Sequence, residues 1–380
     1  AAHRDAVVRK LRGGIKALLA GNKVELIQGA ASFKDAHTLR VAGGDGGRDI
    51  SAEKVIIATG SAPVELPIVP FDHSVIISSD DAVRADQLPE SIVIVGGGYI
   101  GVEFASIYAA FGVEVTIVEA LERLLPGIDE DCAREVVKVL KKDGVAIHTG
   151  TQLEGVGKGN GGVRARLAGG KEVAAQQMLV CVGRRPDCEG LGIENAGLEV
   201  GDKGQLAVNE HMQTSQPHVY AVGDVAGDPL LAHVGSQEGI VAASHATGSI
   251  TAAMDYRVVP ACVFAFPEIA TVGMSESRAA ETVEQVVVKK FPFRALGKAH
   301  VMGQTGGFVK MVADARTGEL LGVHICSAQA SALLGEAALA LRLECTADEL
   351  AETIHAHPTL PEAIREAADG VTGFPVNWKG

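Results

Sequence analysis

A cluster of glycines inside an apolar stretch constrains the fold more than any other feature of this sequence. Residues 92–118 are largely apolar, but Gly96 to Gly98 and Gly101 interrupt them, and a carboxylate follows at Glu103. Repeated glycines and a charge argue against a membrane span. The pattern instead predicts a buried strand, a tight turn, a helix and a second strand, at 91–95, 96–101, 102–111 and 113–119.

The next stretch continues this alternation. Residues 129–142 open with three acidic residues and close with lysines, which is the charge order that a helix dipole favours, and Gly144 follows them. A further strand is expected at 145–148. The order strand, helix, strand, helix, strand predicts a parallel sheet with right-handed crossovers.

The glycine turn has the spacing Gly-x-Gly-x-x-Gly, which alone is a weak signal. Its context strengthens it, because a strand precedes it, a helix follows, and the second strand ends in Glu119. Gly96 permits the turn, Gly98 lets backbone approach a pyrophosphate, and Gly101 lets helix and strand pack closely. Glu119 can accept hydrogen bonds from an adenosine ribose and would repel a 2′-phosphate, so NAD is favoured over NADP. A glycine-rich turn followed by a chance acidic residue is the alternative.

Residues 214–224 suggest a second nucleotide. They contain a short apolar strand that ends in Gly223-Asp224, and a carboxylate at such a strand end lies where an open α/β sheet binds ligands. For Gly-Asp alone, a surface turn is the better interpretation. Residues 54–60 form another apolar strand, which ends in Ala-Thr-Gly. Other patterns predict an amphipathic helix at 5–20, a β-like run at 24–28, a helix at 236–247, and an α+β region from residue 256 onward.

The run His355-Ala-His357-Pro-Thr-Leu-Pro361-Glu362 is the most specific string in the chain. A metal site is disfavoured, because no acidic or cysteine partner lies at ligand spacing, and we expect no metal. The functional interpretation is a histidine on a sharp turn, held by a carboxylate at the start of a helix. Such a carboxylate raises the basicity of the histidine and fixes its tautomer, which suits proton transfer near neutral pH.

Composition limits the partners and the location. The net charge of −13 disfavours nucleic acid and anionic membranes, so neither is an expected partner. The six cysteines are scattered and form no Cys-x-x-Cys, so buried apolar thiols are expected. Residues 1–5 lack the apolar segment of a signal peptide, and we expect a cytoplasmic protein.

Several of these strings together resemble the dihydrolipoyl dehydrogenase branch of the FAD- and NAD-dependent disulfide oxidoreductases. The run 355–362 resembles that branch's His-x-His-Pro-Thr-Leu-Ser-Glu signature, with Pro361 where the family usually has serine. Residues 214–224 and 54–60 resemble FAD-binding strings. Residues 183–186, 267–273 and 318–322 look like further recurrent strings, so the resemblance spans nearly the whole chain.

The resemblance implies roles for individual residues. His357 would be the acid–base catalyst and Glu362 its partner. The residues expected at NAD are Gly96, Gly98, Tyr99, Ile100, Gly101, Glu103, Glu119, Leu153 and Gly183, with Glu103 close to the contact between flavin and nicotinamide. The residues expected at FAD are Gly29, Thr59, Gly60, Asp224, Leu230, Leu231, Ala232 and His233.

The expected fold is α/β, with two Rossmann-like dinucleotide-binding domains, the FAD one incomplete, and a carboxy-terminal α+β dimerisation domain. The expected segments are 1–89 and 187–255 for the FAD-binding domain, 90–186 for the NAD-binding domain, and 256–380 for dimerisation. The resemblance implies a homodimer in which His357 serves the partner's active site. It also implies dihydrolipoamide on a lipoyl domain as substrate, within a 2-oxoacid dehydrogenase or glycine-cleavage complex.

Family members begin with an FAD-binding glycine motif and a Cys-x-x-x-x-Cys redox disulfide, and neither occurs here. We therefore expect a chain that lacks the amino-terminal segment of a dihydrolipoyl dehydrogenase. Without the disulfide, dihydrolipoamide has no electron acceptor in this chain. Two alternatives stay open: a non-catalytic fragment or pseudoenzyme that binds NAD and dimerises, and a related flavin-dependent reductase or transhydrogenase.

Overall fold

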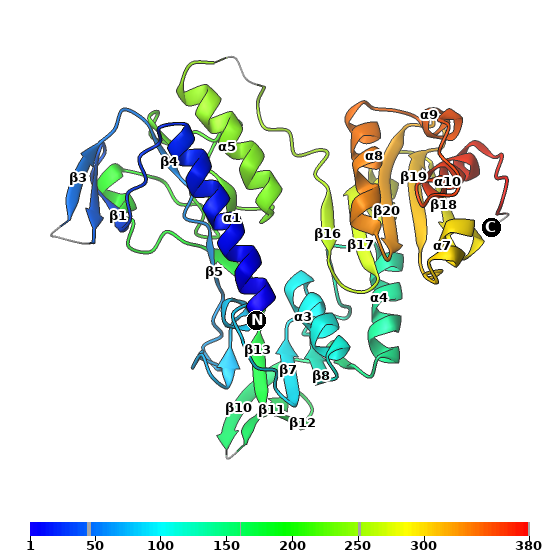
Figure 1. The fold of residues 1–380 in the computed structure, drawn as a ribbon, viewed down its shortest axis with the longest axis horizontal. Helices are drawn as coiled ribbons and strands as arrows, with labels where there is room; N and C mark the ends of the chain where they lie inside the picture. The colour runs from blue at the N-terminus through cyan, green and yellow to red at the C-terminus, as the bar shows by residue number, and fades with distance from the viewer. Residues whose placement is uncertain (44–46, 160, 250–251, 379–380) are drawn as a thin grey trace. The chain divides into compact units, whose positions relative to one another are not determined.

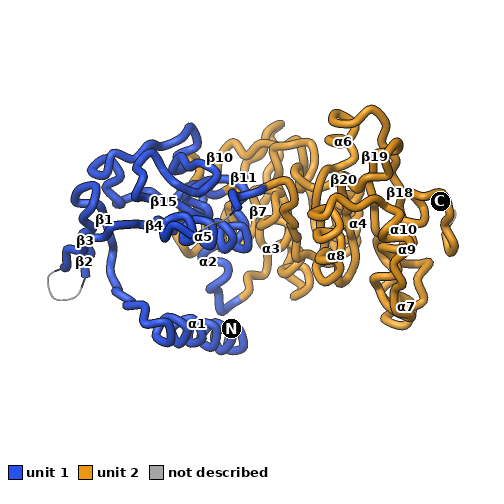
Figure 2. The backbone as a smooth tube through the Cα atoms, turned by 90° about the horizontal axis from the view of Figure 1, so that it is seen from above, with its two compact units in different colours: residues 1–64, 80–87, 184–255 blue, residues 65–79, 88–183, 256–380 orange. Residues whose placement is uncertain are grey.

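The computed structural model describes residues 1–43, 47–159, 161–249 and 252–378 (Figure 1). The chain forms two compact units, each built from several stretches of sequence (Figure 2). Unit 1 contains residues 1–64, 80–87 and 184–255, and unit 2 contains residues 65–79, 88–183 and 256–380.

The first part of unit 2 is a five-stranded parallel sheet. Its strand order is β6 (Ile76–Ile77), β13 (Gln177–Val180), β7 (Ser91–Val95), β8 (Glu114–Val118) and β9 (Ala146–His148). Helix α3 (Tyr99–Ala110) connects β7 to β8, and α4 (Glu130–Lys142) connects β8 to β9. The predicted alternation of strands and helices is therefore confirmed.

A three-stranded antiparallel meander, not predicted from the sequence, packs against this sheet. It consists of β10 (Leu153–Gly159), β11 (Gly162–Leu167) and β12 (Glu172–Ala175). Every second residue of β11 is buried, namely Val163, Ala165 and Leu167, and these pack with sheet residues such as Val93 and Val180. This alternation is the pattern of a strand with one face on a core.

The second part of unit 2 is a five-stranded antiparallel sheet (Figure 1). Its strand order is β16 (Ala261–Val263), β17 (Glu268–Gly273), β20 (Leu320–Ser327), β19 (Phe308–Asp314) and β18 (Val286–Pro292). The helical elements are α6 (Glu276–Thr282), η3 (Phe293–Ala295), α7 (Gly297–Val301), α8 (Ala330–Arg342), α9 (Ala347–Glu352) and α10 (Glu362–Thr372). The expected α+β character of this region is confirmed.

The two faces of this sheet carry different side chains. Val309, Met311, Val323 and Ile325 join one apolar core together with residues of α8 and α10. Because side chains alternate along a strand, Lys310 and His324 point to the opposite face. Elements α4 and α6 contact the strands from that side, where Val312 packs with Ala279 of α6.

Unit 1 has smaller sheets. Strands β1 (Ala30–Asp35), β2 (Thr38–Ala42) and β3 (Arg48–Ser51) form an antiparallel sheet, β4 (Val55–Ile57) pairs in parallel with β15 (Val219–Ala221), and β5 (Ser61–Pro63) pairs with β14 (Arg184–Pro186). The helical elements are α1 (Ala2–Gly21), α2 (Ser79–Ala82, mostly in this unit), η1 (Ile193–Ala196), η2 (Gly223–Ala226) and α5 (Ala232–Ala246).

Three details of unit 1 differ from the sequence-based expectation or qualify it. Residues 24–28 form no strand, and β1 begins only at Ala30. Helix α5 begins at Ala232, one turn before the expected start at residue 236. The amphipathic helix is present as α1, but none of its residues is buried.

Among the described helices, none combines the length and the apolar character that a membrane span needs.

Candidate active site and cofactor-binding residues

His357 and Glu362 form a hydrogen-bonded pair at the start of α10. Nδ1 of His357 lies 2.7 Å from Oε1 of Glu362, the first residue of the helix. The other carboxylate oxygen accepts from the backbone amide of Thr359, at 2.6 Å. Because an ionised carboxylate can only accept, Nδ1 carries the proton of the neutral ring and Nε2 presents a lone pair.

The surroundings keep Glu362 ionised and leave the other side of the His357 ring open to solvent. Burial raises the pKa of Glu362, but the hydrogen bonds from Thr359 and His357 outweigh it and hold the pKa below its usual value. The side chain of His357 is 77% exposed, and its Nε2 bonds to no residue in the described part of the chain. The dyad therefore presents a basic nitrogen to solvent.

Pro361 is compatible with this geometry. It is the N-cap of α10, with φ −57° and ψ −21°, and its carbonyl accepts from the amide of Ile364 at 2.8 Å. Proline fits this place because its missing N–H would have no partner in the first turn of a helix. The helix forms as expected despite the change from the serine of the resembling signature.

His355 has a different environment from His357. Its Nδ1 lies 2.9 Å from the carbonyl of Thr353, and its Nε2 lies 2.8 Å from Oε1 of Glu336 on α8. Its side chain is only 6% exposed. Both ring nitrogens are therefore engaged inside unit 2, and His355 supports the turn that carries His357. Sequence reasoning missed Glu336, whose only signal is one carboxylate in an otherwise apolar helix.

The glycine turn between β7 and α3 has the geometry that its spacing predicts. Gly96 has φ +111°, and a Cβ on Gly101 would overlap the carbonyl oxygen of Gly96. Gly98, in contrast, has no atom within 4 Å of the place a Cβ would take. It is the N-cap of α3 and provides no side-chain cap, so the first amides of the helix at Tyr99 and Ile100 face an open turn.

Glu119 makes contacts that the sequence did not predict. It is buried, with 9% exposure, and its two carboxylate oxygens accept from the amides of Gly97 and Leu121, at 2.5 and 2.7 Å. The residue expected to bind a ribose thus also fixes the glycine turn. Each carboxylate oxygen has a second lone pair, so this role leaves acceptor capacity for a ribose hydroxyl.

The remaining residues expected at NAD also belong to unit 2. Glu103 of α3 accepts from the amide of Phe264 at 2.7 Å, and burial raises its pKa although this hydrogen bond opposes the change. Leu153 begins β10 and pairs with Leu167. Gly183 follows β13, has φ +137°, and has open space where a Cβ would be.

Asp224, expected at FAD, belongs to a polar network in unit 1. The hydroxyl of Ser61 donates to Oδ2 of Asp224 at 2.5 Å. Arg184 donates from Nε to the same hydroxyl and from Nη2 to the carbonyl of Ser61, each at 2.7 Å. Sequence reasoning missed Ser61, although it directly follows the Ala-Thr-Gly string, and it gave Arg184 no role.

The other residues expected at FAD lie on turns and at the start of α5. The hydroxyl of Thr59 donates to the carbonyl of Asp187 at 2.7 Å, and Gly60 has φ +78° with open space around it. Gly29 lies beside Ala42, whose carbonyl would block a Cβ. Leu230 precedes α5, Leu231 is its N-cap without a side-chain cap, and Ala232 and His233 form its first turn.

Buried Glu238 of α5 supports the turn that leads to Asp224. Its Oε2 accepts from the amide of Gly223 at 2.6 Å, and the residue is 3% exposed. Unit 1 therefore brings together the strand end at Gly223-Asp224 and the amino-terminal half of α5. The sequence gave no sign of this contact, because Glu238 lies inside a helical pattern.

All six cysteines are free thiols. Cys132, Cys181 and Cys326 are buried, and burial raises the pKa of each, to about 12 for Cys181 and Cys326. A thiol with so high a pKa is a poor nucleophile at neutral pH.

Comparisons with known proteins match both parts of the chain. The family described as pyridine nucleotide-disulphide oxidoreductase matches residues 1–239, and its dimerisation domain matches residues 259–368. A dihydrolipoyl dehydrogenase of Haloferax volcanii is 44% identical over 382 residues, which cover 98% of this chain and 80% of that protein. One of Geobacillus stearothermophilus is 41% identical over 377 residues, with the same coverage.

Solved structures agree with these relatives. The crystal structure of LpdA from Mycobacterium tuberculosis has a TM-score of 0.91 at 30% identity, and the match covers 96% of this chain and 81% of that one. The HOCl-induced flavoprotein disulfide reductase RclA from Escherichia coli has a TM-score of 0.90 at 29% identity, covering 96% and 84%. The chain therefore belongs to the pyridine nucleotide-disulphide oxidoreductase family, whose members use FAD and NAD(H), and the two relatives described above are dihydrolipoyl dehydrogenases.

Proposed function

We propose that this chain carries out the acid–base and cofactor-binding parts of dihydrolipoyl dehydrogenase chemistry, in which dihydrolipoamide is oxidised and NAD is reduced. The single observation that carries the proposal is the pair of His357 and Glu362, with Nδ1 held by a carboxylate and Nε2 open to solvent. A related flavoprotein that needs no acid–base group beside its substrate would have no use for this arrangement.

The dyad suits proton transfer from a dithiol. Thiols react as thiolates, and a thiol of dihydrolipoamide is mostly protonated at neutral pH. Nε2 of His357 would take the thiol proton, and Glu362 would stabilise the resulting imidazolium through its short contact to Nδ1. Because the carboxylate is already fixed by the amide of Thr359, it does not have to reorient when the charge forms.

The glycine turn fits a nicotinamide dinucleotide. Open space at Gly98 and the uncapped amides at the start of α3 match a pyrophosphate, and Glu119 offers acceptors at the end of β8. Bound there, NAD would supply the hydride acceptor of the reaction. The residues Gly96, Tyr99, Ile100, Gly101, Leu153 and Gly183 complete the proposed site, with Glu103.

The residues of unit 1 fit the second dinucleotide. Asp224 places a carboxylate at the end of β15, and α5 begins after Leu231, an N-cap without a side-chain cap, where the helix dipole is positive. Gly60 leaves room for close backbone approach beside Thr59, whereas at Gly29 the carbonyl of Ala42 leaves no space for a Cβ, so only glycine fits there. The proposed FAD site therefore consists of Gly29, Thr59, Gly60, Asp224, Leu230, Leu231, Ala232 and His233.

The partners follow from the family and not from the contacts of this chain. The match of residues 259–368 to a dimerisation domain supports a homodimer in which each His357 serves its partner. A lipoyl domain of a 2-oxoacid dehydrogenase or glycine-cleavage complex is the proposed substrate carrier, in the cytoplasm. For the domains, we propose residues 1–89 and 187–255 for FAD binding, 90–186 for NAD binding, and 256–380 for dimerisation.

The test measures NAD reduction by the purified chain with FAD and dihydrolipoamide added, together with calorimetric titration of NAD. The proposal expects NAD binding, and any dithiol oxidation should be strongly reduced in His357→Gln. The six cysteines are free thiols in the structure, so this chain shows no disulfide that could accept electrons from the dithiol. NAD binding and dithiol oxidation are therefore scored separately. Binding of NAD with dithiol oxidation that His357→Gln leaves unchanged would remove the acid–base role. Failure to bind NAD would remove the cofactor site.

A further inference from the structure

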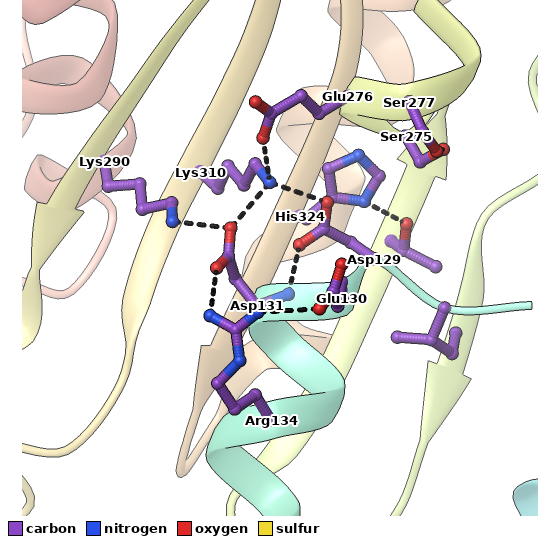
Figure 3. Close-up of polar contacts among 12 residues, drawn as sticks. Asp129, Glu130, Asp131, Arg134, Ser275, Glu276, Ser277, Lys290, Lys310 and His324 are labelled. Carbon is purple, nitrogen blue, oxygen red and sulfur yellow. Dashed lines mark hydrogen bonds and ion pairs between the residues drawn. The ribbon is translucent and has the colours of Figure 1, made fainter. Parts of the chain in front are cut away.

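A buried lysine joins the two sheets of unit 2 through three carboxylates. Lys310 of β19 is 2% exposed at its side chain, and its Nζ lies 2.8 Å from Asp129, 2.7 Å from Asp131 and 2.7 Å from Glu276 (Figure 3). Asp129 and Asp131 lie at the start of α4, next to the parallel sheet, whereas Glu276 begins α6. Lys290 of β18 adds a second cation, 2.5 Å from Asp131.

The position of Lys310 in its strand is unusual for a lysine. Its neighbours Val309 and Met311 are fully buried, and Lys310 is opposite His324 in the register of β19 and β20. Burial alone would lower the pKa of Lys310, but its hydrogen bonds to the three carboxylates raise it above the ordinary value. A buried charge of this kind is stable only while its partners stay in place.

Asp129 connects this cluster to the first turn of α4. Its Oδ1 accepts from the amide of Asp131 at 3.1 Å, which is the N-cap bond of the helix, while its Oδ2 accepts from Lys310. One carboxylate therefore fixes both the helix start and the contact with β19. Residues 120–128, which connect β8 to α4, lead directly into Asp129.

The β8–α4 connection in turn supports the glycine turn. Leu124 and Leu125 are buried, the amide of Leu125 donates to the carbonyl of Gly97 at 2.8 Å, and a methyl of Leu124 occupies the space where a Cβ on Gly97 would be. Arg123 donates to the carbonyls of Leu125 and Ile128, at 3.0 and 3.2 Å, and so holds the connection in a tight loop.

We propose that Lys310 is a positioning residue for the glycine turn 96–101, acting through Asp129 and the β8–α4 connection. The inference rests on the proposed NAD site, because the turn is the part of that site which must meet a pyrophosphate. A buried ion pair stabilises a fold poorly compared with apolar packing, but it demands one geometry. The ion pair of Lys310 and Asp129 would hold the β8–α4 connection in a single arrangement. The hydrogen bond from the Leu125 amide to the Gly97 carbonyl would be held with it.

Two variants of the chain separate the ion pair from the helix cap. Lys310→Met removes the cation, whereas Asp129→Asn keeps an N-cap side chain of the same shape and removes only the charge that faces Lys310. Lys310→Arg retains a cation and is the rescue variant. Arg278→Met is the matched control, because it breaks an exposed ion pair with Glu281 on α6 and lies outside the cluster.

The first readout needs no cofactor. Amide hydrogen exchange, followed by mass spectrometry of peptides that span 119–129, is expected to quicken in Asp129→Asn and Lys310→Met relative to wild type and to Arg278→Met. The second readout is the Kd for NAD, which should rise by about 3- to 30-fold in the same variants, the range for mutations that act through intermediate contacts. Lys310→Arg should restore part of both effects.

The outcomes are separable. If Asp129→Asn is folded by circular dichroism and shows wild-type exchange at 119–129 and a wild-type Kd, the positioning role is wrong. If Lys310→Met does not fold, Asp129→Asn decides alone. If the wild-type chain itself fails to bind NAD, the proposed function loses its cofactor site. Exchange at 119–129 that is unchanged by the variants would then still contradict the coupling.

Discussion

Replacing Glu362 with glutamine should reverse the tautomer of His357. In the wild type, one carboxylate oxygen accepts from the amide of Thr359 and the other from Nδ1 of His357. A glutamine has only one oxygen. If that oxygen stays on the Thr359 amide, the side-chain NH₂ faces Nδ1, which must then accept, and the ring proton moves to Nε2. The nitrogen that is open to solvent would lose its lone pair.

The size of the effect follows from the exposure of the pair. A hydrogen bond to a charged group contributes about 1.5–3 kcal/mol. Because His357 is 77% exposed, solvent screens the interaction, and about 1–2 kcal/mol is the better expectation for stabilisation of the imidazolium. At 1.36 kcal/mol per tenfold change, this corresponds to a loss of about 5- to 30-fold in any step that needs the protonated ring. The change of tautomer lowers the rate further, because Nε2 then has no lone pair with which to accept a proton.

The assay reads the ring nitrogens directly. In a chain labelled with ¹⁵N-histidine, the shifts of the two nitrogens of His357 report which one carries the proton, and His357→Asn provides the assignment. We expect Nδ1 to be protonated in the neutral wild-type ring and Nε2 to be protonated in Glu362→Gln. Glu352→Gln removes an exposed carboxylate of α9 and should leave the tautomer unchanged. A neutral wild-type ring protonated at Nε2 would refute the reasoning.

Three further predictions concern the scaffold. Gly101→Ala should lower the free energy of unfolding by about 1–3 kcal/mol in urea, because its Cβ would overlap the carbonyl of Gly96; Gly239→Ala in α5, which has open space, should raise it by about 0.5–1 kcal/mol. The hydrogen bonds of Asp131 to Lys290 and Lys310 lower its pKa from 3.8 to about 2 against the effect of burial. The folded-state pKa is the lower one, so the stabilisation is full above pH 3.8 and is lost as the pH falls toward 2: urea titrations should show wild type more stable than Asp131→Asn by about 2 kcal/mol at neutral pH, with the gap closing in acid. Alkylation of the native chain should spare Cys132, Cys181 and Cys326 and modify Cys188, Cys262 and Cys345 first, as peptide mass spectrometry would show; early modification of Cys181 would contradict its burial.

The parts of the fold that sequence predicted are those encoded locally. The apolar strand before Gly96, the glycine turn and the charge order of α4 each act within one element, so their pattern suffices to predict β7, α3, β8 and α4. The meander of β10 to β12 was missed. Its register is set by pairing across the strands and by contact with the parallel sheet, and glycines interrupt its apolar alternation.

The run at 24–28 shows the opposite error. Three of its five residues are apolar, as in a short strand, but no neighbouring strand pairs with them in the described structure. A β-like pattern becomes a strand only where a partner satisfies its backbone, so the prediction from pattern alone was wrong there.

The same distinction holds at the candidate site. His357 and Glu362 are five positions apart, so a local string is enough to predict their contact. His355 meets Glu336 across 19 positions, and Lys310 meets Asp129 across 181. Such pairs are decided by how helices and strands pack, and a single sequence carries no local pattern that joins their members. The assignment of cofactors to the individual residues stays a prediction.

The double use of Glu119 limits how this protein could change its cofactor during evolution. The carboxylate that would exclude a 2′-phosphate is also the acceptor for the amides of Gly97 and Leu121. Exchanging it for a basic residue, the obvious route to NADP, would remove the acceptor of the buried Gly97 amide and of the partly buried Leu121 amide in the same step. A lineage that made this exchange would have to acquire a substitute acceptor for the turn first, so a switch of coenzyme is not accessible through a single substitution.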